Sequence, residues 1–326
     1  MKSLRLAYCA FGEPGSVLRL EEVDVSDKLG EGEVLIELVA SPVHPSDIGT
    51  ISGKYGDLPE LPAVGGREGI GRVVGASVSD RDLVGKFVKS PPGAWSILTV
   101  ARIRDLFFVP DGIDPYQAAM AFVNPLTARM LLTQIRSLKP GDWVIQNAAN
   151  SAVGVAVIQI AKHMGIKTIN LVRNARVRRE KLESCGATVI FDSEAFDSRT
   201  LPDYAGGERP LLGLNSVGGN SAVDIIKSMA FGGEVVTFGG MVGDKVRFPT
   251  RELIFNDLRL RGFWLDKWSR RQTHEKMQIL YDTVFAMMRD GILHIPIAST
   301  VRLSDGVAAL LLAYENRKDG KVLVVP

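Results

Sequence analysis

Cysteine and histidine are scarce in this sequence. Only two cysteines, Cys9 and Cys185, occur in 326 residues, so no disulfide framework holds the fold and a reducing compartment suits the chain. The four histidines lie far apart, and none shares a ligand-spaced motif with a cysteine or with another histidine. Because protein metal sites are built from such clusters, we expect no bound metal.

An excess of one charge and long apolar runs are also lacking. The 39 basic residues face 37 acidic ones, a net charge of +2, so no overall field attracts nucleic acid or an anionic membrane. The longest apolar run, VGVAVIQIA at 153–161, is less than half of the ~20 residues that a membrane-spanning helix needs. The opening MKSLRLAYCAFG has no continuous apolar core and no signal-peptide cleavage site. We therefore expect a cytoplasmic protein that binds neither nucleic acid nor membrane.

The chain length predicts about two domains. Short β-branched runs punctuated by Gly and Pro predict a β-rich first third, with strands at 34–40, 69–76, 85–90 and 95–100. From about Pro125 helical and strand patterns alternate, which is typical of a parallel sheet covered by helices on both faces. The C-terminal GKVLVVP is predicted to be a strand that rejoins the first domain.

These patterns predict an α/β protein with one domain inserted into the other. The β-rich domain is discontinuous, over 1–123 and 267–326, and the doubly wound dinucleotide-binding domain covers 124–266.

The stretch VIQNAANSAVG places a tight turn between an apolar strand and a helix. In doubly wound folds such a turn holds a dinucleotide pyrophosphate against backbone N–H groups at the helix start. The glycine fingerprint is thin, because Asn150, Ser151, Ala152 and Val153 precede a single Gly154, which stands where helix and strand pack closely. Asn150 tolerates left-handed backbone, and Asn150 and Ser151 can donate hydrogen bonds to phosphate. An ordinary strand-turn-helix cap is the alternative.

Arginines follow the next strand, in LVRNARVRRE. At this place NAD-specific sites carry an Asp or Glu for the ribose hydroxyls, but this chain has Arg173, Asn174, Arg176, Arg178 and Arg179. Arginine pairs bidentately with phosphate, and a cationic helix start is unfavourable unless an anion binds. We therefore predict NADPH rather than NADH, with a solvated helix start as the alternative.

Specific motifs recur along the chain: HPSDIGTISGKYGDLPELPAVGGREG, FVNPLTARMLL, VIQNAANSAVG, LNSVGG, VTFGGM and LRLRGFWL. Over essentially its whole length the sequence resembles the zinc-free branch of the medium-chain dehydrogenase/reductase superfamily, and within it the NADPH-dependent 2-enoyl thioester reductases of mitochondrial-type fatty acid synthesis. The resemblance implies a GroES-like β-rich catalytic domain and a Rossmann nucleotide-binding domain. The superfamily's zinc enzymes have a ligand cysteine in the segment matching VHPSD and Gly-His-Glu in that matching GGREG, where this chain has His44 and Arg67. Zinc-assisted alcohol chemistry is therefore not expected.

The resemblance implies that a hydride passes from NADPH to the β-carbon of a trans-2-enoyl thioester, of coenzyme A or acyl carrier protein, and leaves an enolate that is protonated at the α-carbon. The family's proton-donating tyrosine lies in the segment that reads GKYGDLP here, which makes Tyr55 the expected donor. A neutral phenol can both hydrogen-bond an oxyanion and deliver a proton. Considered without the motif, Tyr55 would be a packing or surface aromatic.

Further positions are carried over from the family as cofactor contacts: Asn124, Phe238, Gly239, Gly240, Met241, Phe263, Trp264, Leu265 and Lys321. Two departures concern His44 and Arg67, which stand where the family commonly has Asn. Arg67 could stabilise the enolate or pair with the neighbouring Glu68.

Two other functions stay open at this point. One is an NADPH:quinone reductase of the same branch, which needs no obligate acid because water can protonate a reduced quinone. The other is a nucleotide-binding structural protein without catalysis. By analogy with the family we also expect a homodimer, paired through the edge of the nucleotide-domain sheet that GEVVTFG, VGDKVRFP and the LRLRGF strand provide.

Overall fold

The computed structural model of the protein describes residues 1–241, 245–316 and 319–326. The described chain forms two compact units, one of Met1–Val123 with His274–Pro326 and one of Asn124–Thr273. The chain returns from the second unit to the first between residues 273 and 274, whereas the sequence predicted this boundary between 266 and 267. Helix α10 (Leu265–Ser269) stays with the second unit because Phe263, at the end of its last strand, packs on Trp268 of this helix.

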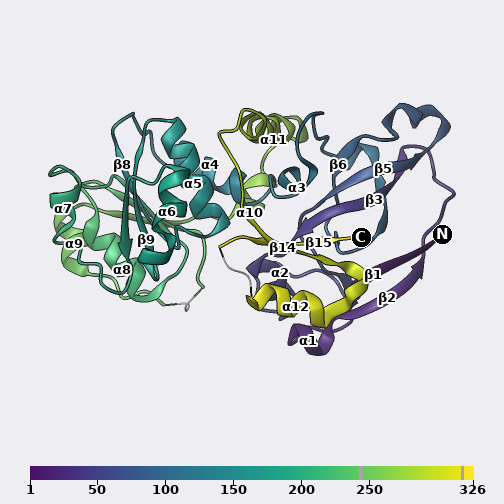
Figure 1. Ribbon diagram of the computed structural model, residues 1–326, viewed down its shortest axis with the longest axis horizontal. Helices are drawn as coiled ribbons and strands as arrows, with labels where there is room; N and C mark the ends of the chain where they lie inside the picture. The colour runs from purple at the N-terminus through teal and green to yellow at the C-terminus, as the bar shows by residue number, and fades with distance from the viewer. Residues whose placement is uncertain (242–244, 317–318) are drawn as a thin grey trace. The chain divides into compact units, whose positions relative to one another are not determined.

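Two sheets form the first unit (Figure 1). The smaller has the order β2-β1-β4, with β1 (Lys2–Tyr8), β2 (Arg19–Asp24) and β4 (Ala63–Val64). The larger has the order β14-β15-β3-β5-β6, with β7 beside β3; its strands are β3 (Glu33–Pro42), β5 (Ile70–Ala76), β6 (Phe87–Lys89), β7 (Leu98–Arg102), β14 (Ile297–Arg302) and β15 (Lys321–Val325). Strand β15 pairs antiparallel with β3, with Leu323 opposite Pro42. The prediction that the C-terminal strand rejoins the first domain is confirmed.

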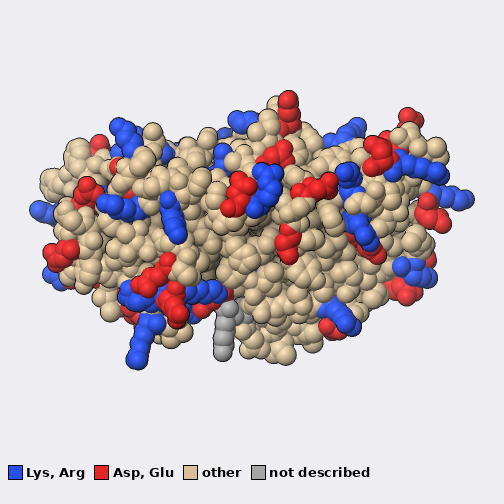
Figure 2. Space-filling view, turned by 45° about the horizontal axis from the view of Figure 1, so that its top comes forward, with Lys and Arg blue, Asp and Glu red and all other residues tan. Residues whose placement is uncertain are grey.

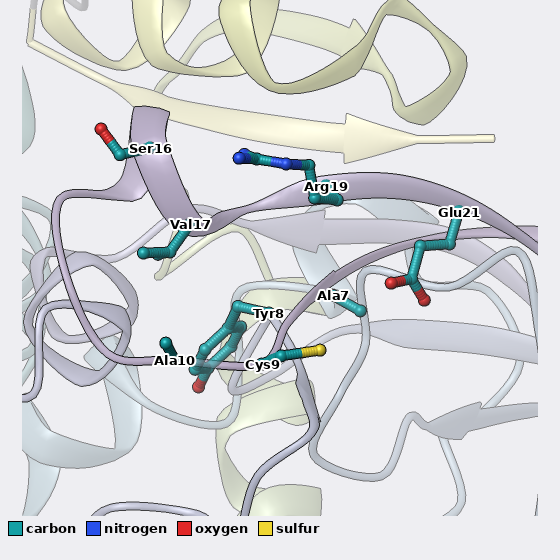
Figure 3. A pocket seen from close by; sticks show the side chains of 8 residues that line it. All are labelled: Ala7, Tyr8, Cys9, Ala10, Ser16, Val17, Arg19 and Glu21. Carbon is teal, nitrogen blue, oxygen red and sulfur yellow. The ribbon is translucent and has the colours of Figure 1, made fainter.

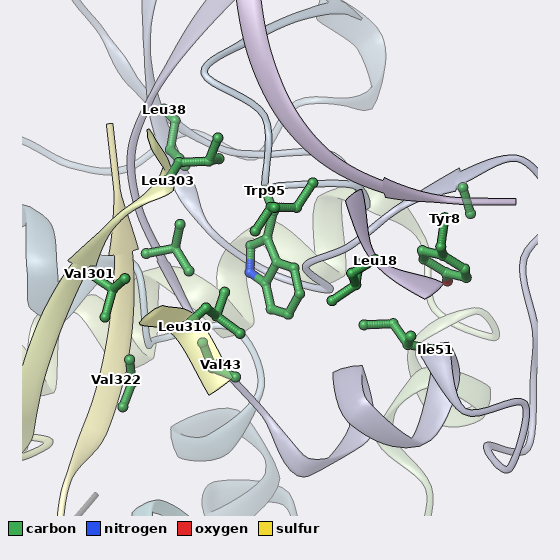
Figure 4. Packing of buried hydrophobic residues seen from close by; sticks show 13 residues of the cluster. Tyr8, Leu18, Leu38, Val43, Ile51, Trp95, Val301, Leu303, Leu310 and Val322 are labelled. Carbon is green, nitrogen blue, oxygen red and sulfur yellow. The ribbon is translucent and has the colours of Figure 1, made fainter. Parts of the chain in front are cut away.

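The helices of this unit are α1 (Pro14–Val17), α2 (Pro45–Ile51), η1 (Val78–Leu83), η2 (Ile103–Asp105), α3 (Pro115–Ala118), α11 (His274–Arg289), η3 (Leu303–Asp305) and α12 (Gly306–Asn316). The core between the sheets is centred on Trp95, which is fully buried among aliphatic side chains from both ends of the chain (Figure 4). A Cβ atom on Gly65 would lie 2.2 Å from this indole ring. The ring therefore packs directly on the backbone that leads to Arg67.

The second unit contains a parallel sheet of order β10-β9-β8-β11-β12-β13 (Figure 1). Its strands are β8 (Trp143–Asn147), β9 (Lys167–Val172), β10 (Val189–Asp192), β11 (Leu212–Asn215), β12 (Glu234–Thr237) and β13 (Arg259–Gly262). The helices are α4 (Asn124–Thr133), α5 (Ala152–His163), α6 (Ala175–Cys185), α7 (Leu201–Tyr204), α8 (Gly219–Ser228), α9 (Thr250–Phe255) and α10.

Helices cover both faces of this parallel sheet. Ile145 and Leu171 pack with Ile225 of α8, whereas Val172 packs with Val155 of α5. Because successive side chains of a strand point to opposite faces, Leu171 and Val172 place the two helices on opposite sides. The predicted doubly wound fold is confirmed.

The surface view in Figure 2 shows basic and acidic side chains interspersed over one face, in keeping with the small net charge. Among the described residues, no helix combines the length and the apolar character that crossing a bilayer requires.

Candidate active site

Tyr55 lies just beyond helix α2, whose start is fixed by a buried carboxylate. Asp47 Oδ2 accepts a hydrogen bond from the backbone N of His44 at 2.7 Å, and Oδ1 accepts one from the backbone N of Arg67 at 2.9 Å. After the helix, Gly53 turns the chain with a φ of +71°. The guanidinium carbon of Arg67 lies 4.6 Å from the centroid of the Tyr55 ring. The Tyr55 ring is therefore partly buried and lies next to the positive charge of Arg67.

A buried polar chain lies beneath this loop. Lys321 Nζ donates to Nδ1 of His44 at 2.9 Å and to the carbonyl oxygen of Val43 at 2.9 Å, while His44 Nε2 lies 2.9 Å from Oε1 of Glu68. Since the ammonium group can only donate, His44 Nδ1 is an acceptor and its Nε2–H donates to Glu68. The side chains of His44 and Glu68 are 3% and 0% exposed. Glu68 thus pairs with His44, whereas the sequence suggested Arg67 as one possible partner.

Burial controls the ionisation of the side chains in this polar chain and of the nearby Asp47. Burial, together with the positive charge of Lys321, lowers the pKa of His44 to about 3, and burial raises the pKa of Glu68 against the opposing charges of Lys321 and Lys89. Burial also raises the pKa of Asp47. The imidazole is therefore neutral at neutral pH, which agrees with its acceptor role toward Lys321.

The depressed pKa of His44 makes the fold sensitive to acid. Below pH 6.5 the unfolded chain binds a proton that the folded imidazole refuses down to about pH 3, so stability is lost as the pH falls through this window. We expect this group alone to lower the free energy of unfolding by about 3 kcal/mol between pH 7 and pH 4. Urea unfolding of the wild type and His44→Asn at a series of pH values tests this, since the variant lacks the imidazole that takes up the proton on unfolding. Equal acid sensitivity of the two proteins contradicts the assignment.

In the second unit the predicted pyrophosphate turn joins β8 to α5. Ser151 Oγ caps the helix by accepting from the backbone N of Gly154 at 3.1 Å. A Cβ atom on Gly154 would lie 2.5 Å from the carbonyl oxygen of Ala149, so only glycine permits this approach of helix and turn. The left-handed residue is Ala148, with a φ of +47°, and not Asn150. The chain reverses directly at the strand end, where the Ala148 carbonyl accepts from the Ser151 amide at 2.8 Å.

The arginines after β9 divide into two pairs. Arg178 donates to the carbonyl oxygen of Arg173, and Arg179 to that of Ile190 at 3.1 Å, so these two guanidinium groups bind the protein itself. Arg173 and Arg176 have exposed side chains around the left-handed Asn174. Two of the four arginines therefore bind backbone carbonyl groups, and the other two have exposed side chains.

An acidic residue that the sequence reasoning missed caps α6. Asp192 accepts from the backbone N of Ala175 at 3.0 Å and from that of Glu194 at 3.1 Å, and these hydrogen bonds lower its pKa. It ends β10, and its parallel pairing opposite Val172 brings it to the end of β9. Through its hydrogen bond to the Ala175 amide, Asp192 places a carboxylate at the arginine-rich start of α6.

The later loops lie at the same carboxyl edge of the sheet, after β12 and β13. The predicted residues of the first loop are Phe238, Gly239, Gly240 and Met241. The loop is held by Phe238 N donating to Asn215 O and Met241 N to Ser216 O. Phe263 N donates to Thr237 O, and Trp264 and Leu265 follow. Since the carboxyl ends of parallel strands share one edge, the turn at 150–154, the arginines and both loops are brought together.

A polar network behind this edge was not predicted. Asn147 Nδ2 donates to Asn215 Oδ1 at 2.8 Å, Asn215 Nδ2 to Thr237 Oγ1 at 3.1 Å, and the Ser216 amide to Asn147 Oδ1 at 2.8 Å. Asn147, Asn215 and Thr237 each end a strand, and this recurrence of polar residues at strand ends was the available signal.

Two predicted residues lie outside these loops. Asn124 begins α4 and is 7% exposed, and its Nδ2 makes no hydrogen bond within the described part of the chain. An orphaned buried donor of this kind fits a ligand acceptor. Lys321 lies in the first unit, where it binds His44 and Val43.

No group of three or more His, Cys, Asp or Glu side chains is arranged to hold a metal within residues 1–241, 245–316 and 319–326. A hollow of about 270 Å³ beside the end of β1, α1 and the start of β2 is lined by Ala7, Tyr8, Cys9, Ala10, Ser16, Val17, Arg19 and Glu21 (Figure 3). It contains none of the predicted site residues.

Comparison with known proteins agrees with this fold. Residues 30–93 match the family described as alcohol dehydrogenase GroES-like domain, and residues 152–281 the family described as zinc-binding dehydrogenase. The human mitochondrial enoyl-[acyl-carrier-protein] reductase is 38% identical over 313 residues, which cover 94% of this chain and 84% of that protein. The chain belongs to this reductase family. A Caenorhabditis elegans member is 37% identical over 335 residues, covering 100% and 96%.

Solved structures of similar proteins show the same fold over the full length. The 2-enoyl thioester reductase Etr1p/Etr2p heterodimer of Candida tropicalis aligns with a TM-score of 0.90 at 27% identity, covering 100% of both chains. A complex of Etr1p with NADP and crotonyl-CoA aligns with a TM-score of 0.89 at 28% identity and the same coverage. A putative NADPH:quinone reductase from Bacillus thuringiensis aligns with a TM-score of 0.91 at 25% identity, covering 100% of this chain and 99% of that one. The names of the curated relatives place them in mitochondria, so they give no support to the cytoplasmic location expected from the sequence.

Proposed function

We propose that this chain reduces trans-2-enoyl thioesters with NADPH and that Tyr55 supplies the proton. The observation that carries the proposal is a partly buried phenol, braced beside Arg67, in a member of the enoyl-thioester reductase family. The relatives' name and the Etr1p complex with NADP and crotonyl-CoA support the substrate class and the cofactor. When bound, NADPH supplies the hydride that adds to the β-carbon of the conjugated thioester.

The second unit carries the residues for the nucleotide. The α5 N-terminus, with Ser151 and the close packing at Gly154, suits a pyrophosphate. The exposed Arg173 and Arg176 suit the 2′-phosphate that distinguishes NADPH from NADH. These groups fit the dinucleotide because each offers donors or positive charge where the cofactor is anionic.

The remaining carried-over residues are proposed to border the nicotinamide and acyl groups. The Phe238–Met241 loop and Phe263–Leu265 follow neighbouring strands and are tied to the sheet by backbone hydrogen bonds. The free donor of Asn124 is proposed to bind an acceptor of the cofactor or substrate. The proposed cofactor contact of Lys321 has to coexist with its hydrogen bonds to His44 and Val43.

The proton chemistry belongs to the first unit. Hydride addition to the β-carbon places negative charge on the thioester oxygen as an enolate. Tyr55 is proposed to donate its hydroxyl proton to the α-carbon, which completes the saturation. Solvent then returns a proton to the phenolate oxygen.

We further propose that the reaction needs no zinc. In the position matching a zinc-ligand cysteine, His44 uses Nδ1 to accept from Lys321 and directs Nε2–H to Glu68. A metal ligand must offer a nitrogen lone pair, and both ring nitrogens are already committed. The donor set therefore does not suit a metal ion.

Quinone reduction is the second candidate, favoured by the fold match to the putative quinone reductase. It uses the same nucleotide residues but does not require protonation at carbon. Homodimerisation through the β13 edge also stays a prediction, which light scattering can test.

One assay separates the candidate functions. Purified protein is given NADPH or NADH with crotonyl-CoA or a quinone, and cofactor absorbance is followed. We expect crotonyl-CoA to be the better oxidant and NADPH to be preferred over NADH about ten- to a hundredfold, the size of one or two charge-assisted hydrogen bonds. A faster quinone reaction favours the quinone reductase, and NADPH binding without turnover of either substrate favours a non-catalytic protein.

A further inference from the structure

Arg67 is held beside Tyr55 by several independent contacts. Its guanidinium carbon lies 4.6 Å from the phenol ring centroid, and Nη1 donates to Oγ1 of Thr50 at 3.3 Å. Its backbone N donates to Asp47 at 2.9 Å. Both Arg67 and Tyr55 are partly buried, so the charge acts on the ring with less screening than at an open surface.

The buried Asp47 carboxylate links the two chain segments that carry this pair. Asp47 is 1% exposed and accepts from the backbone N of both His44 and Arg67. Helix α2, which begins after His44, also carries Thr50, the acceptor of the Arg67 side chain, and leads into the Tyr55 loop. The distance between guanidinium and phenol is therefore set by backbone contacts as well as by the side chains.

We propose that Arg67 is a positioning residue for proton donation by Tyr55. The inference rests on the proposed function and deepens it. When Tyr55 reacts, its O–H bond breaks, a C–H bond forms at the enolate α-carbon, and the negative charge moves from the enolate to the phenol. No group is oxidised or reduced in this step, and water later returns the proton. A cation over the ring face attracts the ring more strongly once the ring carries this charge, so Arg67 stabilises the transfer while keeping the ring oriented.

The test compares Arg67→Gln and Arg67→Lys with the wild type in NADPH-dependent crotonyl-CoA reduction, measured in H₂O and in D₂O. We expect Arg67→Gln to lower kcat about three- to thirtyfold, the range of a cation–π contact, with KM nearly unchanged. The solvent isotope effect on kcat should grow, because proton transfer becomes the slower step. Arg67→Lys should recover part of kcat, since it keeps the charge but loses the planar stacking.

Arg72→Gln is the matched control. Arg72 lies in β5 of the same unit, is exposed, and pairs only loosely with Glu37 at 3.7 Å. This variant should keep the wild-type kcat and isotope effect. If Arg72→Gln changed kcat and the isotope effect as much as Arg67→Gln does, the protein's net charge would be responsible, and not the position of Arg67 beside Tyr55.

The outcomes are distinct. Wild-type kcat and isotope effect in Arg67→Gln overturn the inference, as does a lower kcat with an unchanged isotope effect, which indicates a structural role alone. If circular dichroism shows that Arg67→Gln does not fold, Arg67→Lys decides, and wild-type values in that variant overturn the inference. Failure of the proposed function is seen separately, as a wild type that does not reduce crotonyl-CoA.

Discussion

Replacing Tyr55 by Phe is expected to lower kcat/KM for NADPH-dependent crotonyl-CoA reduction by about a hundred- to ten-thousandfold, the usual contribution of a positioned acid. Phe keeps the aromatic ring and its contact with Arg67, whose guanidinium carbon lies 4.6 Å from the ring centroid in the wild type. Only the hydroxyl group is lost, so the enolate has no proton donor in place. NADPH binding, measured by fluorescence titration, should be unchanged because Tyr55 is not among the residues proposed to hold the nucleotide.

Tyr116→Phe provides the matched control for the loss of a phenolic hydroxyl. Tyr116 lies in α3 of the same unit and is 38% exposed, and its variant should keep the wild-type rate. Near-normal turnover of crotonyl-CoA by Tyr55→Phe would contradict the proton-donor assignment. Retained quinone reduction beside lost thioester reduction would support it, since a reduced quinone can take its proton from water.

The fold of the second unit could be predicted because its signals are local. Each apolar strand is followed by a turn and a helix, and a right-handed crossover then determines where the next strand lies. The alternation predicted from about Pro125 corresponds to the observed succession of β8, α5, β9, α6 and β10. Sequence reasoning also placed the pyrophosphate turn and the arginines after neighbouring strands, and the parallel sheet brings them to one edge.

The buried polar chain of the first unit could not be predicted because its members meet through tertiary contacts. His44 bonds to Glu68, 24 residues away, and to Lys321, 277 residues away. The sequence predicted that the last strand returns to the first domain, but the register of Leu323 opposite Pro42 decides which side chain reaches His44. No local pattern contains that register.

Asp192 illustrates the same limit on a smaller scale. The residues directly after β9 are rich in arginine, whereas the carboxylate comes from the end of β10. This carboxylate is an anion supplied by the protein itself at the start of α6. The prediction of NADPH therefore depends now on the exposed Arg173 and Arg176 rather than on all four arginines.

Lys321→Met is expected to reduce the free energy of unfolding by about 3–5 kcal/mol, as when one partner of a buried charged group is removed. Lys321 is 7% exposed, and its ammonium group donates to His44 Nδ1 and to the carbonyl oxygen of Val43. Met fills a similar volume but offers no donor, so two buried acceptors lose their partner. The loss also removes the positive charge that opposes the raised pKa of Glu68, so that carboxyl group should retain its proton to higher pH.

A double-mutant cycle that combines Lys321→Met with Glu68→Gln shows whether the lost free energy of unfolding comes from the hydrogen-bonded chain of Lys321, His44 and Glu68. With the amide already in place, Lys321→Met should cost at least about 1 kcal/mol less, because the interaction of the ammonium with the carboxyl group through His44 is already lost. Lys2→Met is the control: Lys2 pairs with Glu22 and Asp24 at the surface and is 63% exposed, and its loss should cost at most about 1 kcal/mol. Urea unfolding at neutral pH measures all four proteins of the cycle and the control. Additive losses for Lys321→Met and Glu68→Gln would mean that the ammonium and the carboxyl group are not coupled through His44, and that Lys321 stabilises the fold through Val43 alone.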